Sequence, residues 1–198
     1  AAHAATCTPA APGAPAATVG MVRFTGATVE YLVLSDAVVL VDTGTDLVVA
    51  TDDSVRRHVG DLAAAAASAA GRDGGVALTA LIAAQQRLRN QPGGYWIAQA
   101  DPAAAGMAVT GTVPDAVGAL LLSDGAALPA TEFGAVDWRE LADLGYAAGP
   151  AGIIAVTREL ERSDPDGTVW PRYKRHDDAT AVVCRPDPWL TPGTGPGR

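Results

Sequence analysis

In two segments of the sequence, aspartates that could bind a metal ion stand beside a run of apolar, strand-like residues. Asp124 follows one such run and is itself followed by Gly125, which favours a tight turn at the end of a strand. Asp177 and Asp178 stand directly before a second run of β-branched and small apolar residues. If the two predicted strands are antiparallel neighbours, these carboxylates converge at one edge of a sheet.

Converging carboxylates with few cations nearby repel one another. A hard divalent cation such as Mg²⁺ or Mn²⁺, bound through oxygen, is the usual relief. The sequence therefore predicts that Asp124 and Asp177 belong to a metal site. Each motif also has a plainer explanation, because an Asp-Gly pair after a strand is often only a turn, and Asp178 can cap backbone N–H groups.

The order of the motifs carries a family resemblance. An apolar strand with Ser-Asp-Gly at 123–125 is followed, about 50 residues later, by Asp-Asp-Ala-Thr at 177–180 and another apolar strand. This order resembles the C-terminal half of metal-dependent Ser/Thr protein phosphatases of the PP2C type. The resemblance covers most of residues 18 to 186 and is strongest to divergent members of an actinobacterial type.

Two further segments support the resemblance. Residues 29–55 are similar to the central hairpin of the family, with a turn at Ser35-Asp36-Ala37 and a Thr-x-Asp-x-Ser-like segment at Thr51 to Ser54. Residues 89–115 are similar to the stretch that precedes the Asp-Gly motif.

The resemblance implies a protein phosphatase that acts on phosphoserine or phosphothreonine in protein substrates. Two Mg²⁺ or Mn²⁺ ions would activate a bridging water, which attacks the phosphorus directly. Asp124 and Asp177 match metal ligands of the family, whereas Asp178 stands where the family usually has Asn and is expected to orient the site. Gly125 would let the backbone pass close to the metal, and Thr180 would support the Asp177 loop by hydrogen bonding.

The basic cluster that precedes the aspartate pair has two interpretations. Its side chains, above all Arg175, could contact the substrate phosphate. They could equally form a solvated loop that balances the two aspartates, and the sequence favours this second interpretation. The cluster comprises Arg172, Lys174, Arg175 and His176.

The N-terminal motifs of the family, an Asp-Gly whose Asp bridges both metals and a phosphate-binding Arg, are not recognisable in this chain. We therefore expect the chain to represent the C-terminal portion of such a domain. The alternative is a non-catalytic, phosphatase-like module that binds a phosphoprotein or a partner domain without turnover.

A further alternative comes from the segment around Asp42, which reads Asp-Thr-Gly-Thr. This pattern is typical of aspartic proteases, in which two such aspartates activate water. Because a second Asp-Thr-Gly is absent, activity would require a homodimer of the retropepsin kind. The pattern fits a hairpin turn equally well, with Gly44 at positive φ.

Composition limits the remaining classes. The chain has 198 residues, a net charge of −8 and a pI near 4.7, which argues against nucleic acid or an anionic membrane surface as partner. No apolar run approaches the roughly 18 to 20 residues of a membrane span. The two cysteines, Cys7 and Cys184, give no disulfide framework, so a cytoplasmic location is the simplest expectation.

The pattern along the chain predicts an α+β domain at residues 19–186 between an Ala/Pro-rich tail at 1–18 and a Pro/Gly-rich tail at 187–198. The predicted strands are 19–24, 29–34, 38–41, 47–50, 95–98, 118–122 and 180–184. The predicted helices are 54–70, with Ser54 as N-cap and Gly71 as stop, 76–89 and 150–162. The resemblance sharpens this to part of an α-β-β-α sandwich.

Overall fold

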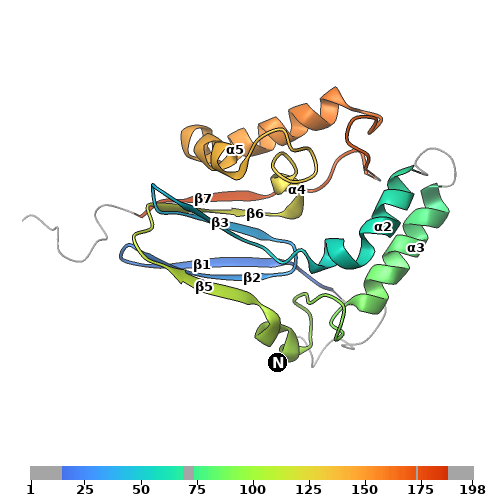
Figure 1. The fold of residues 1–198 in the computed structure, drawn as a ribbon, viewed down its shortest axis with the longest axis horizontal. Coiled ribbons are helices and arrows are strands. Elements are labelled where there is room, and N and C mark those ends of the chain that lie inside the picture. Colours follow the sequence, from blue (N-terminus) through green and yellow to red (C-terminus); the bar gives the residue numbers. More distant parts are fainter. Residues whose placement is uncertain (1–14, 69–73, 173, 187–198) are drawn as a thin grey trace, which may run out of the picture.

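A computed structural model describes residues 15–68, 74–172 and 174–186. The predicted tail at 187–198, most of the predicted tail at 1–18, and the predicted helix stop at Gly71 lie outside the described residues. Within the described residues the fold is α+β, with two antiparallel sheets packed face to face (Figure 1).

The three-stranded sheet has the order β1-β2-β5 and the four-stranded sheet has the order β4-β3-β6-β7. The strands are β1 (Val19–Thr25), β2 (Thr28–Leu34), β3 (Val38–Asp42), β4 (Leu47–Ala50), β5 (Val109–Val113), β6 (Gly118–Leu122) and β7 (Ala181–Cys184). The helices are α2 (Ser54–Ser68), α3 (Gly74–Leu88), the 3₁₀ helix η1 (Pro102–Met107), α4 (Asp124–Ala127) and α5 (Trp138–Ser163). Six of the predicted strands are confirmed with small shifts at their ends, and β5 was not predicted.

Strand β3 lies at the centre of the molecule, and all of its residues are buried. Successive side chains of a strand point to opposite faces, so burial on both faces favours an unbroken apolar run, here Val38 to Val41. Val39 and Val41 face the three-stranded sheet and pack with Val29 and Val33. On the other face, Leu40 joins the cluster beneath α5, which contains Val38, Leu120, Leu122, Ala126, Ala127, Leu141, Ala142 and Ile153.

Helices α2 and α3 form an antiparallel pair with a small apolar cluster of their own, made of Val59, Ala66, Leu81 and Ala84. Figure 1 shows this pair beside the right-hand ends of the two sheets, while α5 lies over the four-stranded sheet. In the described part of the chain, helix therefore covers one outer face of the sandwich. The second helical layer of the predicted α-β-β-α arrangement is not seen there, because the α2–α3 pair packs mainly against itself.

Helix α5 begins earlier than predicted. Asp137 and Glu140 form a capping box, in which each side chain accepts a hydrogen bond from the other residue's backbone N–H at 2.8 Å. The predicted start at Pro150 corresponds to a break inside the helix, where Gly149 has φ 70° and ψ −178°. Pro150 then occupies the first position of the second segment, which proline favours because it has no N–H to bond.

Replacing Gly149 by alanine is expected to destabilise the fold by about 1 to 3 kcal/mol, since the backbone conformation at Gly149 is accessible essentially only to glycine. Urea unfolding measures this effect. Gly75→Ala in α3 is the matched control, because no atom lies within 4 Å of the added Cβ. An equal effect of both substitutions would contradict the strain assigned to Gly149.

Two local predictions are wrong. Residues 95–98 form only isolated bridges, Tyr95 with Arg89 and Ala98 with Ala17, because no continuous strand lies beside them. Ser54 does not cap α2 with its side chain, since its buried hydroxyl has no hydrogen-bond partner. Instead the Oδ1 of Asp52 accepts the Ser54 N–H at 2.9 Å. None of the helices that the structure describes has the length and apolar character needed to cross a membrane.

Candidate functional site

The antiparallel order of the four-stranded sheet brings four acidic segments to one edge. The register pairs Val38 with Leu122, and Leu122 with Ala181, so the start of β3, the end of β6 and the start of β7 lie side by side. The end of β4 lies at the same edge, because Ala50 pairs with Val39. Asp36, Asp52, Asp124 and Asp177 adjoin these four strand ends, and we call them the carboxylate edge. The antiparallel pairing on which the predicted convergence of Asp124 and Asp177 depends is confirmed.

Asp36 reaches this edge through a sharp turn between the two sheets. Ser35 adopts a left-handed conformation with φ 66° and is buried, so the chain reverses between β2 and β3. The Ser35 carbonyl accepts the Asp52 N–H at 3.3 Å, which ties the turn to the end of β4. The turn at Ser35-Asp36-Ala37 and the segment at Thr51 to Ser54, both within the stretch that resembles the phosphatase hairpin, are therefore in contact.

Asp124 lies in the first turn of the short helix α4, where a simple turn was expected. Ser123 caps this helix, and its Oγ accepts the Ala126 N–H at 3.4 Å. Ser123 is also bonded to Thr180, whose N–H donates to the Ser123 Oγ at 3.0 Å and whose carbonyl accepts the Ser123 N–H at 2.9 Å. Thr180 thus links the Asp124 and Asp177 segments through its backbone.

Gly125 makes the close approach of these two segments possible. A Cβ at this position would lie 2.2 Å from the carbonyl oxygen of Asp178 and 3.3 Å from the Cβ of Asp177. Any side chain there would collide with backbone, so only glycine fits. The predicted close approach of the Gly125 backbone to a metal stays a prediction, while the structure shows its close approach to the Asp178 carbonyl.

Asp177 is held from several directions. Its N–H donates to the Oε1 of Glu161 at 3.2 Å, and its carbonyl accepts a hydrogen bond from the Nη2 of Arg158 at 2.7 Å. Its carboxylate accepts the ammonium group of Lys174 at 2.8 Å and the backbone N–H of Asp178 at 3.0 Å. Residues of α5 therefore fix the backbone at Asp177. The hydrogen bonds from Lys174 and from the Asp178 N–H both end on the same carboxylate oxygen of Asp177, Oδ1.

Glu161 organises this network from inside α5. Its side chain is 1% exposed, and its Oε2 bonds to the Nη1 of Arg158 at 2.7 Å and to the Nδ1 of His176 at 2.8 Å. Burial acts to raise the pKa of the Glu161 carboxyl, but the hydrogen bonds from Arg158, His176 and the Asp177 backbone outweigh burial and lower it. Glu161 is thus an ionised, buried anchor for the chain segment that carries Asp177.

Glu161→Gln is expected to destabilise the protein by about 1.5 to 3 kcal/mol at neutral pH, the usual value of hydrogen bonds to a charged group. A carboxyl whose pKa is lowered by folding stabilises the fold above its unfolded-state pKa, and this stabilisation is lost as the pH falls through its lower folded value. The difference in free energy of unfolding between the wild type and Glu161→Gln should therefore become smaller below about pH 4.5, the ordinary pKa of glutamate. Urea unfolding at several pH values tests both points. The control is Glu159→Gln, which alters an exposed residue of the same helix.

The carboxylate edge is electrostatically unfavourable as it stands. Burial, followed by the charges of Asp52 and Asp177, raises the pKa of the Asp36 carboxyl. Burial, followed by the charges of Asp36 and Asp177, raises the pKa of the Asp124 carboxyl, and the ammonium group of Lys174 offsets this only in part. Asp124 is accessible to solvent, so screening by water reduces the repulsion it feels.

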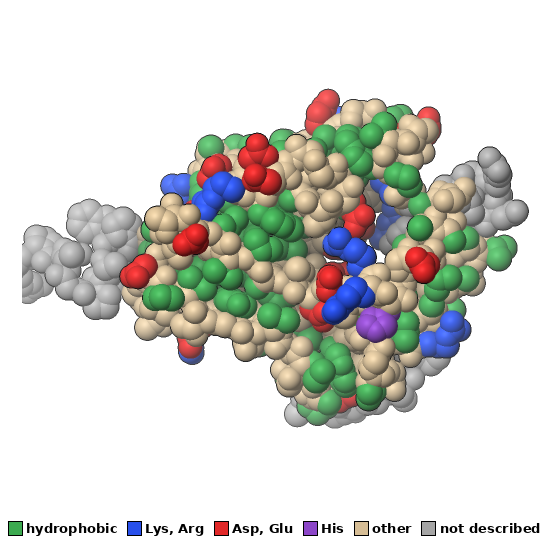
Figure 2. All heavy atoms as spheres, in the orientation of Figure 1, with side chains coloured by type: hydrophobic (Ala, Val, Ile, Leu, Met, Phe, Trp, Pro, Cys, Tyr) green, Lys and Arg blue, Asp and Glu red, His purple; other side chains and the backbone are tan. Residues whose placement is uncertain are grey.

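These carboxylates have the chemistry of a site for a hard cation. Oxygen donors from four chain segments are the ligands that Mg²⁺ and Mn²⁺ prefer, and a cation would remove the repulsion among them. Among the described residues, no three His, Cys, Asp or Glu side chains already lie close enough together to hold a metal ion. Ligation would therefore require the carboxylates to rotate toward a shared point. Figure 2 shows acidic and basic side chains gathered at this end, beside a hollow between α5 and the α2–α3 pair.

The basic cluster divides into different roles. Arg172 is largely buried and pairs with Asp164 at 2.9 Å, where it fixes the loop after α5. Lys174 bonds to Asp177. Arg175 is exposed, and its carbonyl accepts a hydrogen bond from Arg172. The phosphate contact by Arg175 stays a prediction, and the other members of the cluster are bonded to acidic groups of the loop or of α5.

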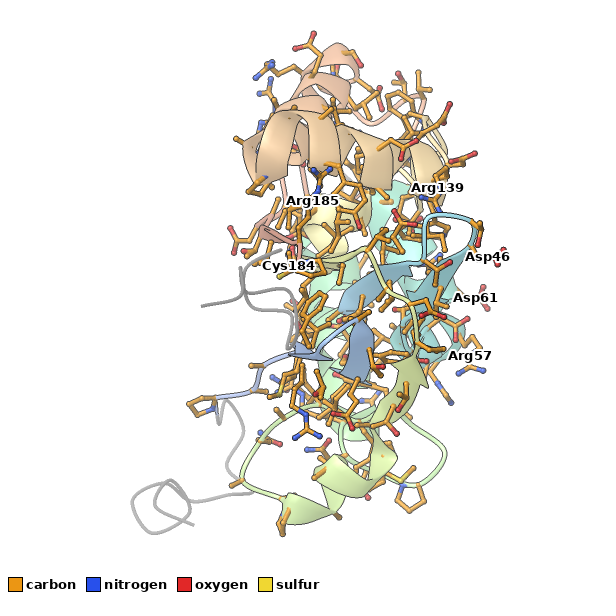
Figure 3. The ribbon with its side chains drawn as sticks, turned by 90° about the vertical axis from the view of Figure 1, so that its left-hand side faces the viewer. Asp46, Arg57, Asp61, Arg139, Cys184 and Arg185 are labelled. Atoms are coloured by element: carbon orange, nitrogen blue, oxygen red, sulfur yellow. The ribbon has the colours of Figure 1, made fainter. Side chains whose placement is uncertain are left out.

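Asp42 lies at the opposite end of β3 from the carboxylate edge. Its Oδ1 pairs with the Nη1 of Arg139 at 3.0 Å and accepts the Gly44 N–H at 2.8 Å. Gly44 has φ 86°, as expected for the hairpin turn. Figure 3 shows Arg139 pointing from α5 toward the hairpin whose tip carries Asp46. The Asp42 carboxylate is thus held at the hairpin turn by the Arg139 guanidinium and the Gly44 N–H, and the protease alternative stays untested.

No protein-family model, curated protein or solved structure matches this chain. Its function can therefore be inferred only from the geometry of the carboxylate edge and from the sequence motifs that form it.

The sequence motifs did not identify Asp36, Asp52 or Glu161 as residues of the site. Asp36 and Asp52 flank predicted strands in the same way as Asp124 and Asp177, so the rule that found one pair also applies to the other. Glu161 gave no such signal, because a glutamate near the end of a helix is usually exposed.

Proposed function

We propose that this chain is a metal-dependent phosphatase domain that hydrolyses phosphoserine or phosphothreonine in protein substrates. The observation that carries the proposal is the carboxylate edge, where Asp36, Asp52, Asp124 and Asp177 adjoin neighbouring strand ends and where burial and the charges of the other aspartates raise the carboxyl pKa of Asp36 and Asp124. A protein retains such repulsion at a cost in stability, which a functional site can justify.

In this proposal, Asp124 and Asp177 would hold Mg²⁺ or Mn²⁺, and Asp36 would be a third oxygen donor at the same edge. A bound metal would supply a water of lowered pKa and would offset negative charge on the phosphoryl group. Glu161 and Arg158 keep the Asp177 backbone in place, and Gly125 keeps the two ligand segments in contact. The PP2C-type sandwich and the cytoplasmic location belong to the same proposal.

The test is hydrolysis of a phosphothreonine peptide by the purified chain with and without Mn²⁺. We expect phosphate release that requires Mn²⁺ and is unchanged by Asp42→Asn in folded protein. Binding of Mn²⁺ and the peptide without phosphate release would support the non-catalytic module instead. A chain that neither binds Mn²⁺ nor releases phosphate would contradict the proposal.

A further inference from the structure

A surface pocket of about 410 Å³ opens beside the carboxylate edge. Its size lies within the range of roughly 300 to 1,000 Å³ that is common for small-ligand sites. Two arginines of α5, Arg158 and Arg162, are four positions apart and so lie on the same face of the helix. His176, Asp177 and Asp178 complete the lining.

The side-chain nitrogens of the pocket differ in how firmly they are held. Arg158 donates to the Glu161 carboxylate and to the Asp177 carbonyl, both at 2.7 Å, so it is fixed in place. His176 is anchored to Glu161 through Nδ1, which leaves its other ring nitrogen for a ligand. Arg162 contacts Glu159 through Nη2 at the surface, and the remaining N–H groups of its guanidinium can bind an anion.

The pocket carries both signs of charge on different elements. The two arginines come from α5, and the aspartates, with His176, come from the segment that leads into β7. An anion alone would be attracted by the arginines and repelled by Asp177 and Asp178. A divalent cation at the carboxylate edge would offset the negative charge of the aspartates, so an anion bound next to it would interact favourably with both the arginines and the cation. The two N–H groups of a guanidinium fork match the spacing of phosphate oxygens.

We propose that this pocket binds the phosphate group of a phosphate monoester, with Arg162 as a direct contact and Arg158 and His176 as fixed supporting donors. The substrate class follows from the phosphatase activity proposed above, on which this inference rests. In this proposal the phosphate contact lies on α5, whereas the sequence offered Arg175 as one possible contact and favoured a solvated loop.

The test is calorimetric titration of the folded chain with inorganic phosphate in the presence of Mg²⁺. Arg162→Ala should weaken phosphate binding by about tenfold or more, and Arg162→Lys should recover part of the loss because it keeps the charge but not the fork. The control is Arg23→Ala. Arg23 is also exposed and is also paired with a single glutamate, Glu30, but it lies in the three-stranded sheet, away from the pocket. This variant should bind phosphate as the wild type does.

A parallel titration with Mg²⁺ alone separates this inference from the proposed function. If Mg²⁺ binds but Arg162→Ala binds phosphate as tightly as Arg23→Ala, the phosphate pocket is wrong and the metal site stands. If phosphate binding depends on Arg162 although Mg²⁺ does not bind, the pocket stands and the metallophosphatase proposal fails. Absence of phosphate binding to the wild type would overturn the inference.

Discussion

Replacement of both Asp124 and Asp177 by asparagine is expected to abolish Mn²⁺ binding while the metal-free protein stays folded. Wild type at a Mn²⁺ concentration of 100 times the Kd should gain about 2.7 kcal/mol of stability, and the double variant should gain none. Mn²⁺-dependent phosphate release should fall by at least about 100-fold, because loss of outer-shell partners alone typically costs 10- to 100-fold.

The same substitution should not lower the stability of the metal-free protein at neutral pH. The pKa of the Asp124 carboxyl is raised by folding, so its contribution to stability is present at low pH and is lost as the pH rises through the folded value. At neutral pH the ionised carboxylate is therefore unfavourable, and an uncharged amide relieves it. The bond between Asp177 and Lys174 is partly exposed and contributes little.

Thermal unfolding with and without Mn²⁺ measures both effects. The control is Asp46→Asn with Asp61→Asn, which removes two exposed carboxylates elsewhere on the surface, both labelled in Figure 3. The control should keep the full response to Mn²⁺. A double variant at 124 and 177 that is stabilised by Mn²⁺ as much as the wild type would show that the metal binds elsewhere.

Gly125→Ala is the second substitution with a large expected effect. Its Cβ would lie 2.2 Å from the carbonyl oxygen of Asp178, so the start of α4 and the segment before β7 must move apart. Overpacking of this kind costs about 1 to 3 kcal/mol. Because Asp124 and Asp177 are carried by the two segments that separate, we also expect Mn²⁺ affinity to fall by about tenfold or more.

Gly60→Ala is the matched control for this substitution. Gly60 lies inside α2, and no atom lies within 4 Å of the added Cβ. Alanine favours helix over glycine by about 1 kcal/mol, so this variant should be slightly more stable and should bind Mn²⁺ normally. Normal stability and normal Mn²⁺ binding in Gly125→Ala would contradict the close packing assigned to the site.

The elements of the sheets could be predicted from the sequence because their apolar runs are short and bounded by turn residues. β3 is an example, since its unbroken run indicates burial on both faces. β5 could not be predicted, because Thr110, Gly111 and Thr112 are weakly apolar and the strand is an edge strand formed by pairing with β2. Local sequence carries little information about such pairing.

The candidate site was predictable in part for the same reason. Asp124 and Asp177 adjoin recognisable strands, so their convergence required only antiparallel pairing. Glu161 and the Arg158–Arg162 face acquire their roles through contacts between α5 and a loop distant in sequence. No pattern within α5 specifies which loop it will meet, and these residues could be identified only from the structure.

Calorimetric titration of the chain with Mn²⁺ at pH 7 tests whether the carboxylate edge is a metal site. We expect saturable binding by a protein that unfolds cooperatively, and loss of that binding when both Asp124 and Asp177 are replaced by asparagine. A folded wild-type chain that takes up no Mn²⁺ would contradict the assignment of the carboxylate edge as a metal site.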